Sequence, residues 1–302
     1  MLLENHGKLP HLPEVGDTDA PAVRWRSVSA QSQPMLKGKF NVRCLGVGDG
    51  WPSADRRHSS FLYRLGKNTI LIDCGDGASS GYKSTHLPCD LVDRIFISHL
   101  HSDHSAGFFI LMQGFWLEQR KKELRVSLPA DGIKPVSQML EASYIYPELL
   151  PFQLRLEALH AAKPVAVGDA RVTAFRTSHL DRLRKSFKKK YPQTFDAFSF
   201  LIEASGLRIG HSADLGRVED LGPLVRQPLD LLVCELAHFR AEDLFTYLNG
   251  RNIKRVIFTH VARPYWQDLK NTRQLAAKML TRIPFAFARD NDEFPLAQPT
   301  GR

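Results

Sequence analysis

The chain has 302 residues, of which 43% are hydrophobic and 24% are charged, an ordinary globular composition with ample material for a buried core. No run approaches the roughly 18–20 apolar residues that a membrane span needs, so we expect no membrane partner. The formal net charge of +9 favours anionic partners such as nucleic acid or phosphorylated metabolites.

The N-terminal residues 1–38 mix acidic, proline-bearing and polar stretches and contain no apolar signal-peptide core. We therefore predict a loosely packed extension over residues 1–38 and one catalytic domain over residues 39–302. The cysteines are scattered and form no CxxC metal pair; they are Cys44, Cys74, Cys89 and Cys234. A chain of this size without a disulfide framework is typical of a reducing cytoplasm, which is the predicted location.

From residue 40 onward, the sequence predicts short apolar strands that are separated by glycine turns. In the first half these strands span residues 40–45, 60–65, 68–72 and 91–97. The second and third strands form a predicted hairpin that turns at Gly66-Lys67. Residues 107–121 have the apolar content and the length of a helix.

The second half shows the same alternation of elements. Strands are predicted over residues 170–176, 197–203, 207–211 and 229–234, and helices over residues 241–248 and 269–280. Strands that alternate with helices indicate a layered α/β protein.

The two halves also resemble each other in their strand ends. Residues 92–99 parallel residues 253–260, because each is an apolar strand that ends in a hydroxyl residue and a histidine. Residues 69–73 are echoed by residues 207–214, and each of these segments ends in an aspartate. Two similar halves that face each other would bring these strand ends to one shared edge.

The strongest local signal is a group of potential metal ligands directly after the predicted strand at residues 91–97: His99, His101, Asp103 and His104. Side chains at positions i and i+2 of an extended backbone project the same way, so His99 and His101 can reach one ion. Asp103 and His104 follow the turn and can address a neighbouring ion. Neutral imidazoles with carboxylates suit zinc best, while manganese and iron also fit.

Three further candidate ligands lie at the ends of predicted strands. They are His179 after residues 172–177, Asp214 at the end of residues 209–214 and His260 after residues 256–259. Active sites of α/β sheets gather at the carboxyl ends of strands, so we expect these three side chains to join the histidine-rich loop. Asp214 has a position suited to a carboxylate that bridges two cations.

These elements, with Leu71-Ile72-Asp73-Cys74-Gly75 upstream, resemble the metallo-β-lactamase superfamily over roughly residues 39–296. The resemblance implies a four-layer αβ/βα sandwich, an α/β fold with a site for two divalent metal ions at the edge between its halves. It implies one metal on His99, His101 and His179, a second on Asp103, His104 and His260, and Asp214 bridging them. Asp73 matches the family's first-motif aspartate, which helps to organise the site through hydrogen bonds.

Within that superfamily, the chain is most similar to ribonuclease Z and related phosphodiesterases. Residues 46–50 and Arg56-Arg57-His58-Ser59-Ser60 resemble their glycine turn and Arg-x-x-Ser opening, and Asp73-Cys74-Gly75-Asp76-Gly77 is similar to their Asp-Cys-Gly-Glu-Gly. Glu235-Leu236-Ala237-His238 precedes His260 much as a glutamate and a catalytic histidine precede the last ligand there. His238 would then donate a proton to the leaving group or contact the scissile phosphate; the plainer alternative is a surface histidine. His211 is expected to be structural.

One departure from ribonuclease Z concerns substrate binding. Only 35 positions (179 to 214) replace the interval that holds the long Gly/Pro-rich tRNA-gripping arm of common bacterial ribonucleases Z. This interval carries a basic tract instead: Arg182, Arg184, Lys185, Lys188, Lys189 and Lys190. Either the tract is simply solvated, or Lys188 and Lys189, with Arg263 after the last histidine, bind substrate phosphates. The resemblance therefore supports phosphodiester hydrolysis more than tRNA processing.

We therefore predict a dinuclear metal-dependent hydrolase, foremost a phosphodiesterase or endonuclease acting on RNA or a phosphodiester metabolite. A water between two cations would lose its proton, and the resulting hydroxide would attack phosphorus, oriented by Asp103 and Asp214, while His238 protonates the leaving group. The alternatives are a lactonase, β-lactamase-like amidase or thioesterase on the same metals, an iron-dependent oxygen-using relative, and a non-catalytic RNA-binding relative. A homodimer is compatible with the sequence, although no surface stripe indicates one.

Overall fold

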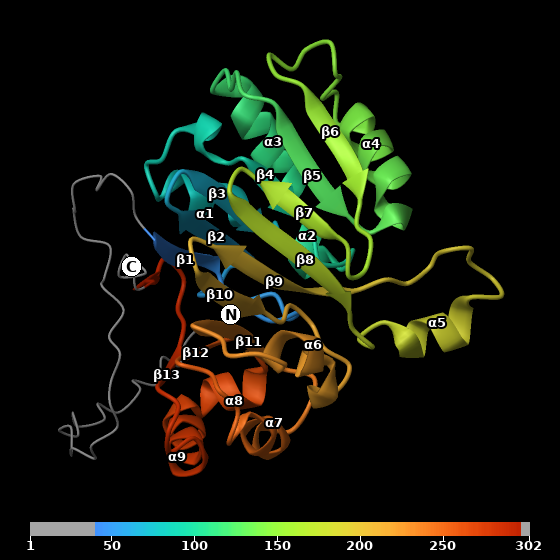
Figure 1. The fold of residues 1–302 in the computed structure, drawn as a ribbon. Helices are drawn as coiled ribbons and strands as arrows, with labels where there is room; N and C mark the ends of the chain where they lie inside the picture. The colour runs from blue at the N-terminus through green and yellow to red at the C-terminus, as the bar shows by residue number, and fades with distance from the viewer. Residues whose placement is uncertain (1–39, 297–302) are drawn as a thin grey trace, which may run out of the picture.

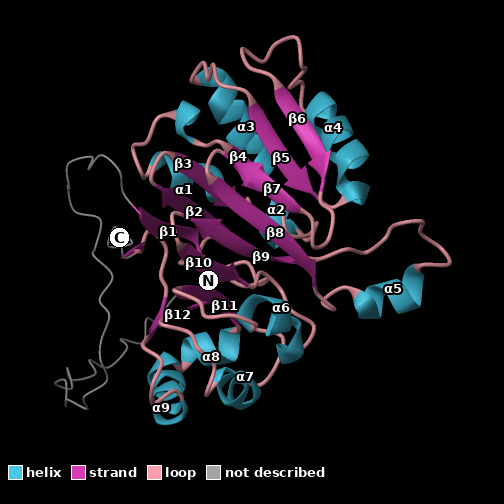
Figure 2. Cartoon of the chain, viewed as in Figure 1, coloured by secondary structure: helices cyan, strands magenta, loops and turns pink. Residues whose placement is uncertain are grey.

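Two β-sheets pack face to face, and helices cover the outer side of each sheet (Figure 1). The computed structural model describes residues 40–296, and within this range each sheet has seven strands. The layers follow the order helix, sheet, sheet, helix (Figure 2), which confirms the predicted αβ/βα sandwich. The extension predicted over residues 1–38 lies outside the described residues.

The first sheet has the strand order β14-β1-β2-β3-β4-β5-β6. Its strands are β1 (Phe40–Gly46), β2 (Ser60–Leu65), β3 (Asn68–Ile72), β4 (Arg94–Phe96), β5 (Leu124–Leu128), β6 (Leu154–Ala158) and β14 (Glu293–Pro295). Pairing is antiparallel from β14 to β3 and parallel from β3 to β6. The β2–β3 hairpin turns at the predicted position, where Gly66 has a left-handed backbone with φ 69°.

The second sheet has the strand order β13-β12-β11-β10-β9-β8-β7. Its strands are β7 (Pro164–Val167), β8 (Ala170–Arg176), β9 (Phe198–Ala204), β10 (Leu207–His211), β11 (Leu231–Leu236), β12 (Val256–Val261) and β13 (Phe285–Phe287). Pairing is antiparallel from β7 to β10 and parallel from β10 to β13. The two sheets therefore have the same pattern of strand directions.

This shared pattern tests the predicted resemblance between the halves. β3 and β10 are equivalent, because each lies where antiparallel pairing changes to parallel, in agreement with the sequence comparison of their ends. The predicted match between residues 92–99 and residues 253–260 does not join equivalent strands. By position in the sheets, β4 corresponds to β11, and β12 corresponds to β5. Residues 92–99 and 253–260 share only their chemistry, an apolar strand that delivers a histidine.

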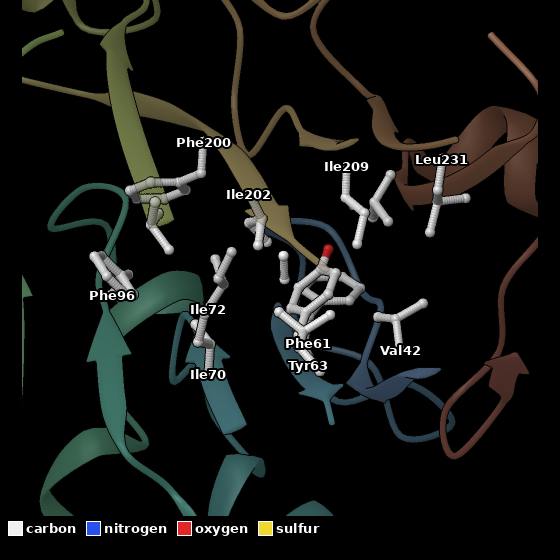
Figure 3. Packing of buried hydrophobic residues seen from close by; sticks show 14 of the residues in the cluster. Val42, Phe61, Tyr63, Ile70, Ile72, Phe96, Phe200, Ile202, Ile209 and Leu231 are labelled. Atoms are coloured by element: carbon white, nitrogen blue, oxygen red, sulfur yellow. The ribbon is translucent and has the colours of Figure 1, made fainter. Parts of the chain in front are cut away.

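The main core lies between the two sheets (Figure 3). Val42, Tyr63 and Ile70 from the first sheet face Phe200 and Ile209 from the second, and all five are fully buried. Strands covered on both faces need apolar side chains at consecutive positions, which explains why every residue of β3 and β11 is buried and why residues 70–72 and 231–234 are consecutive apolar residues.

Helices pack on the outer faces of both sheets. On the first sheet lie α1 (Ala78–Lys83), α3 (Phe108–Leu117) and α4 (Ile133–Ala142), and on the second α6 (Gly222–Val225), α7 (Ala241–Leu248), α8 (Arg263–Gln267) and α9 (Leu269–Met279). Short 3-10 turns span Cys89–Leu91, Ala130–Gly132 and Val218–Leu221. α2 (Ser102–Ser105) lies at the edge where the sheets meet, whereas α5 (Asp181–Phe187) projects away from both (Figure 1). Between residues 40 and 296, no helix is long and apolar enough to span a bilayer.

The predicted elements agree with the structure best where glycines or polar turns bound them. α7 has the predicted bounds, and α9 ends one residue early. β4 is shorter than predicted because Cys89–Leu91 forms a 3-10 turn, and β11 starts and ends two residues late. Nothing was predicted for β5, β6 and β7, because β5 and β6 are interrupted by charged residues and β7 has only four residues.

Candidate metal centre

The first sheet contributes the histidine-rich loop that follows β4. The backbone stays extended as far as His101, and α2 begins at the next residue. His99 therefore precedes the helix, while Asp103 and His104 lie within it and face the second sheet. His99 and His104 are buried. The change of direction after His101 is the one that the sequence predicted.

The second sheet contributes the other three predicted ligands. His179 and Asp214 each follow the end of a strand by three positions, and His260 is the second-to-last residue of β12. The structure thus brings all seven predicted ligands to one edge between the sheets, although His104 and His260 are 156 positions apart.

Three non-glycine residues at this edge have a left-handed backbone: Asp73 with φ 59°, Ala213 with φ 44° and His260 with φ 48°. Each is a residue of the site or its direct neighbour. Such conformations cost about 1–3 kcal/mol for a residue with a side chain, and they gather at functional sites. The surrounding packing must therefore hold these strand ends in place.

The first group of donor atoms consists of His99, His101, His179 and Asp214, and these atoms all lie within 4.8 Å of one another. His101 Nδ1 lies 3.0 Å from His99 Nε2 and 3.2 Å from His179 Nε2. Asp214 Oδ2 lies 3.8 Å from His99 Nε2 and 3.7 Å from His179 Nε2. Four donor atoms on three separate segments thus converge on one point.

The second group consists of Asp103, His104, His260 and again Asp214. His104 Nε2 lies 3.4 Å from His260 Nε2 and 3.4 Å from Asp103 Oδ2. The other carboxylate oxygen of Asp214, Oδ1, lies 3.2 Å from His104 Nε2 and 3.6 Å from His260 Nε2. One oxygen of Asp214 faces each group, which is the geometry of a carboxylate that bridges two cations.

The spacing of the donor atoms fits metal ions. A tetrahedral zinc with bonds of about 2.0–2.1 Å has edges between ligand atoms of about 3.3 Å, and the separations above run from 3.0 to 3.8 Å. Asp214 Oδ1 is buried and accepts no hydrogen bond, so it has a lone pair free for a cation. The clustered histidines and aspartates are consistent with a dinuclear metal site, and several divalent metals suit these donors.

Asp73 contacts the histidine-rich loop on the side away from the cluster, through hydrogen bonds to Ser98 and His104. Its Oδ2 lies 2.7 Å from His104 Nδ1 and accepts a 2.9 Å hydrogen bond from Ser98 Oγ, while its Oδ1 accepts one of 2.7 Å from the Ser98 amide. Ser98 Oγ also lies 3.0 Å from His99 Nδ1. These contacts fix both rings so that each Nε2 faces the cluster.

The electrostatics differ between the two groups. Burial holds the pKa of His99 well below its usual range and lowers the pKa of His179 to about 4, so both rings are neutral near pH 7 and can donate a lone pair. Burial also disfavours the charged forms of His104 and His260, but nearby carboxylates, above all Asp214, outweigh it and raise the pKa of both rings. The carboxylates of the second group therefore favour a positive charge at this position, and a divalent cation would supply it.

His238 faces the cluster from the open side. Its Nδ1 lies 2.9 Å from both carboxylate oxygens of Glu235, and its Nε2 lies 3.7 Å from Asp214 Oδ2. The side chain of His238 is 32% exposed, against 1% for Glu235, so the ring is within reach of a bound molecule. Burial would lower the pKa of His238, but the hydrogen bond and charge of Glu235, with the charge of Asp214, raise it to about 9.

Other predicted residues lie outside the cluster. His211 is buried between the sheets, where its Nδ1 lies 2.8 Å from the Tyr63 hydroxyl, as expected of a structural residue. Arg263 begins α8 at the same edge as the cluster but does not contact it. Lys188 and Lys189 are exposed at the end of the projecting α5, and no described contact joins them to the ligands.

Two contributors were not predicted as site residues. Ser98 binds both Asp73 and His99, and its place directly before the first histidine was the available signal. Arg56 was noticed only within the Arg-x-x-Ser likeness, yet its guanidinium bonds to the carbonyl of Val261, next to His260. No local pattern reveals a contact between residues 205 positions apart.

Known proteins share both the sequence signature and the fold. A family model described as "Beta-lactamase superfamily domain" matches residues 68–261, more than half of the chain. Ribonuclease Z of Archaeoglobus fulgidus is 30% identical over 141 residues, which cover 47% of this chain and 45% of that protein. The match thus spans less than half the length of that relative.

Solved structures match over a larger part of the chain. The metallo-β-lactamase fold protein YhfI from Bacillus subtilis superposes with a TM-score of 0.68 at 18% identity, covering 84% of this chain and 99% of that one. The short form of human tRNase Z gives a TM-score of 0.64 at 20% identity, covering 85% and 100% of the two chains. At these identities the structures bear on the fold alone.

Proposed function

The chain belongs to the metallo-β-lactamase superfamily, and from this premise we propose that it is a dinuclear metal-dependent hydrolase that cleaves phosphodiesters. The observation that carries the proposal is the pair of facing donor groups joined by the two oxygens of Asp214. The distant relation to ribonuclease Z and the net charge of +9 favour a phosphodiester over an uncharged ester.

The residues divide into two ligand sets. We assign His99, His101 and His179 to one ion and Asp103, His104 and His260 to the other, with Asp214 between them. The histidine-rich donor set suits zinc best, and manganese or iron is compatible with it. When bound, two divalent cations would acidify a water molecule and polarise the oxygen of the electrophile. Asp73 and Ser98 keep the first-sheet rings pointed at this position.

His238 is the residue assigned to proton transfer. Its Nδ1 faces the Glu235 carboxylate, so the proton that it can deliver is on Nε2, which points toward the cluster. When the P–O bond breaks, that proton passes to the departing alkoxide, and the ring regains a proton from solvent. Asp103 and Asp214 are assigned to orienting the attacking water through their carboxylate oxygens.

Phosphate recognition is assigned to basic side chains at the rim. Arg263 begins α8 beside the cluster, and Lys188 and Lys189 directly follow α5, nine and ten positions after His179. Their charges would neutralise the phosphates that flank the scissile bond in RNA or a smaller phosphodiester. The short α5 segment replaces a long tRNA-gripping arm, so tRNA processing is not part of the proposal.

A substrate panel tests the reaction class. The zinc-loaded protein is assayed with bis(p-nitrophenyl) phosphate, a dinucleotide, a lactone and a cephalosporin, with chelated protein as the blank. We expect turnover of both phosphodiesters and little of the others. Turnover of the lactone or cephalosporin alone would move the assignment to those hydrolases. Bound iron together with oxygen consumption would indicate an oxygen-using relative. Tight RNA binding without bound metal and without turnover would indicate a non-catalytic RNA-binding protein.

A further inference from the structure

His260 occupies a β-bulge. In the parallel pairing of β11 with β12, Glu235 pairs with Thr259 and the next residue, Leu236, pairs with Val261, so His260 is the extra residue. Its backbone is left-handed, with φ 48°. A bulge takes its residue out of the ladder and redirects the side chain. Here the redirected ring places Nε2 at 3.1 Å from Asp103 Oδ2.

A single loop, residues 47–56, binds the main chain on both sides of this bulge. The His260 amide, which the ladder does not use, donates to the Val47 carbonyl at 2.9 Å. Arg56 Nη1 donates to the Val261 carbonyl at 3.1 Å. The loop thus contacts the peptide groups that determine where the imidazole points, although it contributes no ligand itself.

Arg56 is itself fixed on two sides. Its Nη2 lies 3.2 Å from Asp49 Oδ1, and the two side chains are only 5% and 4% exposed. Its guanidinium lies over the Trp266 ring of α8, 4.5 Å from the centroid. A buried Arg–Asp pair carries a large desolvation penalty and is weak evidence for a purely stabilising role. Arg56 also donates to the carbonyl of Val261, the residue after the candidate ligand His260, so the pair is placed to position that ligand.

We infer that Arg56 is a positioning residue for one half of the metal centre, because it holds the His260 bulge in the conformation that aims Nε2 at Asp103 and Asp214. The inference rests on the proposed function insofar as the cluster binds two cations. It is selective: Arg56 contacts nothing next to His99, His101 or His179, so only the ion on Asp103, His104 and His260 depends on it.

Arg120 offers a matched control. It is fully buried, its guanidinium donates to the carbonyls of Val92 and Glu123, and it lies 5.3 Å from the Phe115 ring centroid. Arg56 and Arg120 therefore share burial, carbonyl contacts and an aromatic neighbour. Val92 and Glu123 lie just before the starts of β4 and β5, so Arg120 is at the opposite end of these strands from the candidate ligands. Replacing either arginine with methionine removes a buried charge and its carbonyl bonds, but only one change is next to His260.

The experiment compares wild type, Arg56→Met, Arg56→Lys and Arg120→Met by zinc titration, metal analysis after dialysis and thermal unfolding. We expect two zinc ions per chain in wild type and in Arg120→Met, even though the melting temperature of the latter falls. Arg56→Met should keep one tight ion and bind the second about 10–100-fold more weakly, the usual effect of losing an outer partner. Arg56→Lys should fall between, because one ammonium cannot serve both Asp49 and Val261.

Excess zinc should restore the activity of Arg56→Met toward bis(p-nitrophenyl) phosphate. Asp49→Asn keeps the size of the partner and is the milder variant if Arg56→Met does not fold; it should weaken the second ion in the same direction. Unchanged second-ion affinity in the folded Arg56 or Asp49 variant overturns the inference alone. Equal loss of an ion in Arg120→Met also overturns it, since the effect would be general. A wild-type protein with no second ion overturns the proposed function as well.

Discussion

Asp214 differs from the other candidate ligands because both groups of donor atoms share it. Each of its carboxylate oxygens faces a different set of histidines, and Oδ1 has no hydrogen-bond partner. The residue before it, Ala213, has a left-handed backbone, so a strained turn determines where the Asp214 side chain begins and which way it points.

Asp214→Asn should therefore weaken both ions together. The amide keeps the shape of the side chain but removes the charge and one of the two equivalent oxygens. We expect the activity at limiting zinc to fall by more than about 100-fold, beyond the effect of losing an outer partner. Zinc titration and bis(p-nitrophenyl) phosphate turnover give the measurement. Asp243→Asn, on an exposed position of α7, should leave both unchanged. Loss of only one ion would contradict the bridging role.

The role proposed for His238, proton transfer to the leaving group, depends on which group leaves. Protonation matters most for an alkoxide, which leaves poorly, and least for p-nitrophenolate, which leaves without a proton. His238→Ala should slow dinucleotide cleavage by about 10²–10⁴-fold, the range of general acid catalysis, and bis(p-nitrophenyl) phosphate far less. Glu235→Gln should show the same selectivity with a smaller effect. Equal losses on both substrates would indicate substrate binding instead of proton transfer.

At the scale of elements, the site depends on a close crossing between the turn after β3 and the start of α3. A Cβ atom on Gly107 would lie 2.1 Å from the Gly75 carbonyl oxygen, and one on Gly75 would lie 2.2 Å from the Asp103 carbonyl oxygen. Only glycine allows the two backbones to approach so closely. This crossing sets the distance between Asp73 and the ligands of α2.

Gly107→Ala should consequently destabilise the fold. The methyl group meets backbone that cannot move cheaply, so we expect a loss of about 1–3 kcal/mol in the free energy of unfolding, measured by urea denaturation. Gly114→Ala in α3 is the matched control, because only the Ser79 side chain lies within 4 Å of the new methyl. That change should stabilise by about 0.5–1 kcal/mol through the helix propensity of alanine. Equal effects would refute the crossing argument.

At the scale of the whole molecule, the candidate metal centre lies where the edges of the two sheets meet. The first sheet contributes the loop from His99 to His104, and the second contributes His179, Asp214 and His260. Ions at this edge would link segments that are otherwise joined mainly by the apolar core between the sheets. Metal binding and global stability are therefore expected to be coupled.

Chelation should lower the melting temperature of the wild-type protein. One ion at 100 times its dissociation constant stabilises by about 2.7 kcal/mol, which corresponds to about 5–10 °C for a domain of this size. Differential scanning calorimetry with and without 1,10-phenanthroline gives the shift, and zinc should reverse it. Asp214→Asn should show a much smaller shift. A melting temperature insensitive to chelation would argue against tightly bound ions.

The projecting α5 segment and the two lysines that follow it are the part of the molecule where we propose contacts with a long substrate. Replacing Lys188 and Lys189 with alanine should raise KM for an oligonucleotide and should leave the turnover of bis(p-nitrophenyl) phosphate unaffected. The slope of log K for oligonucleotide binding against log salt concentration should become shallower by about 1 per lost phosphate contact. Lys270→Ala with Lys278→Ala on α9 is the control for net charge. If both pairs weaken oligonucleotide binding equally, the effect is one of total charge and α5 has no special role.

The sequence by itself determined the local chemistry. The spacing of His99, His101, Asp103 and His104 after an apolar strand, the hairpin at Gly66-Lys67 and the bounds of α7 are all consequences of neighbouring residues, and the structure has them as predicted. The short strands β6 and β7 were missed because charged residues interrupt β6 and β7 has only four residues, and because β6 is stabilised by pairing with β5, 30 positions earlier (124 to 154), which local patterns do not record.

Only the tertiary structure decided how the donor atoms face one another. Three features arise where chain segments far apart in sequence pack together: the two-sided position of Asp214, the bulge that contains His260, and the hydrogen bond from Arg56 to Val261. A residue's type limits what it can bind, but its direction follows from backbone conformations that the surrounding fold stabilises against their local cost.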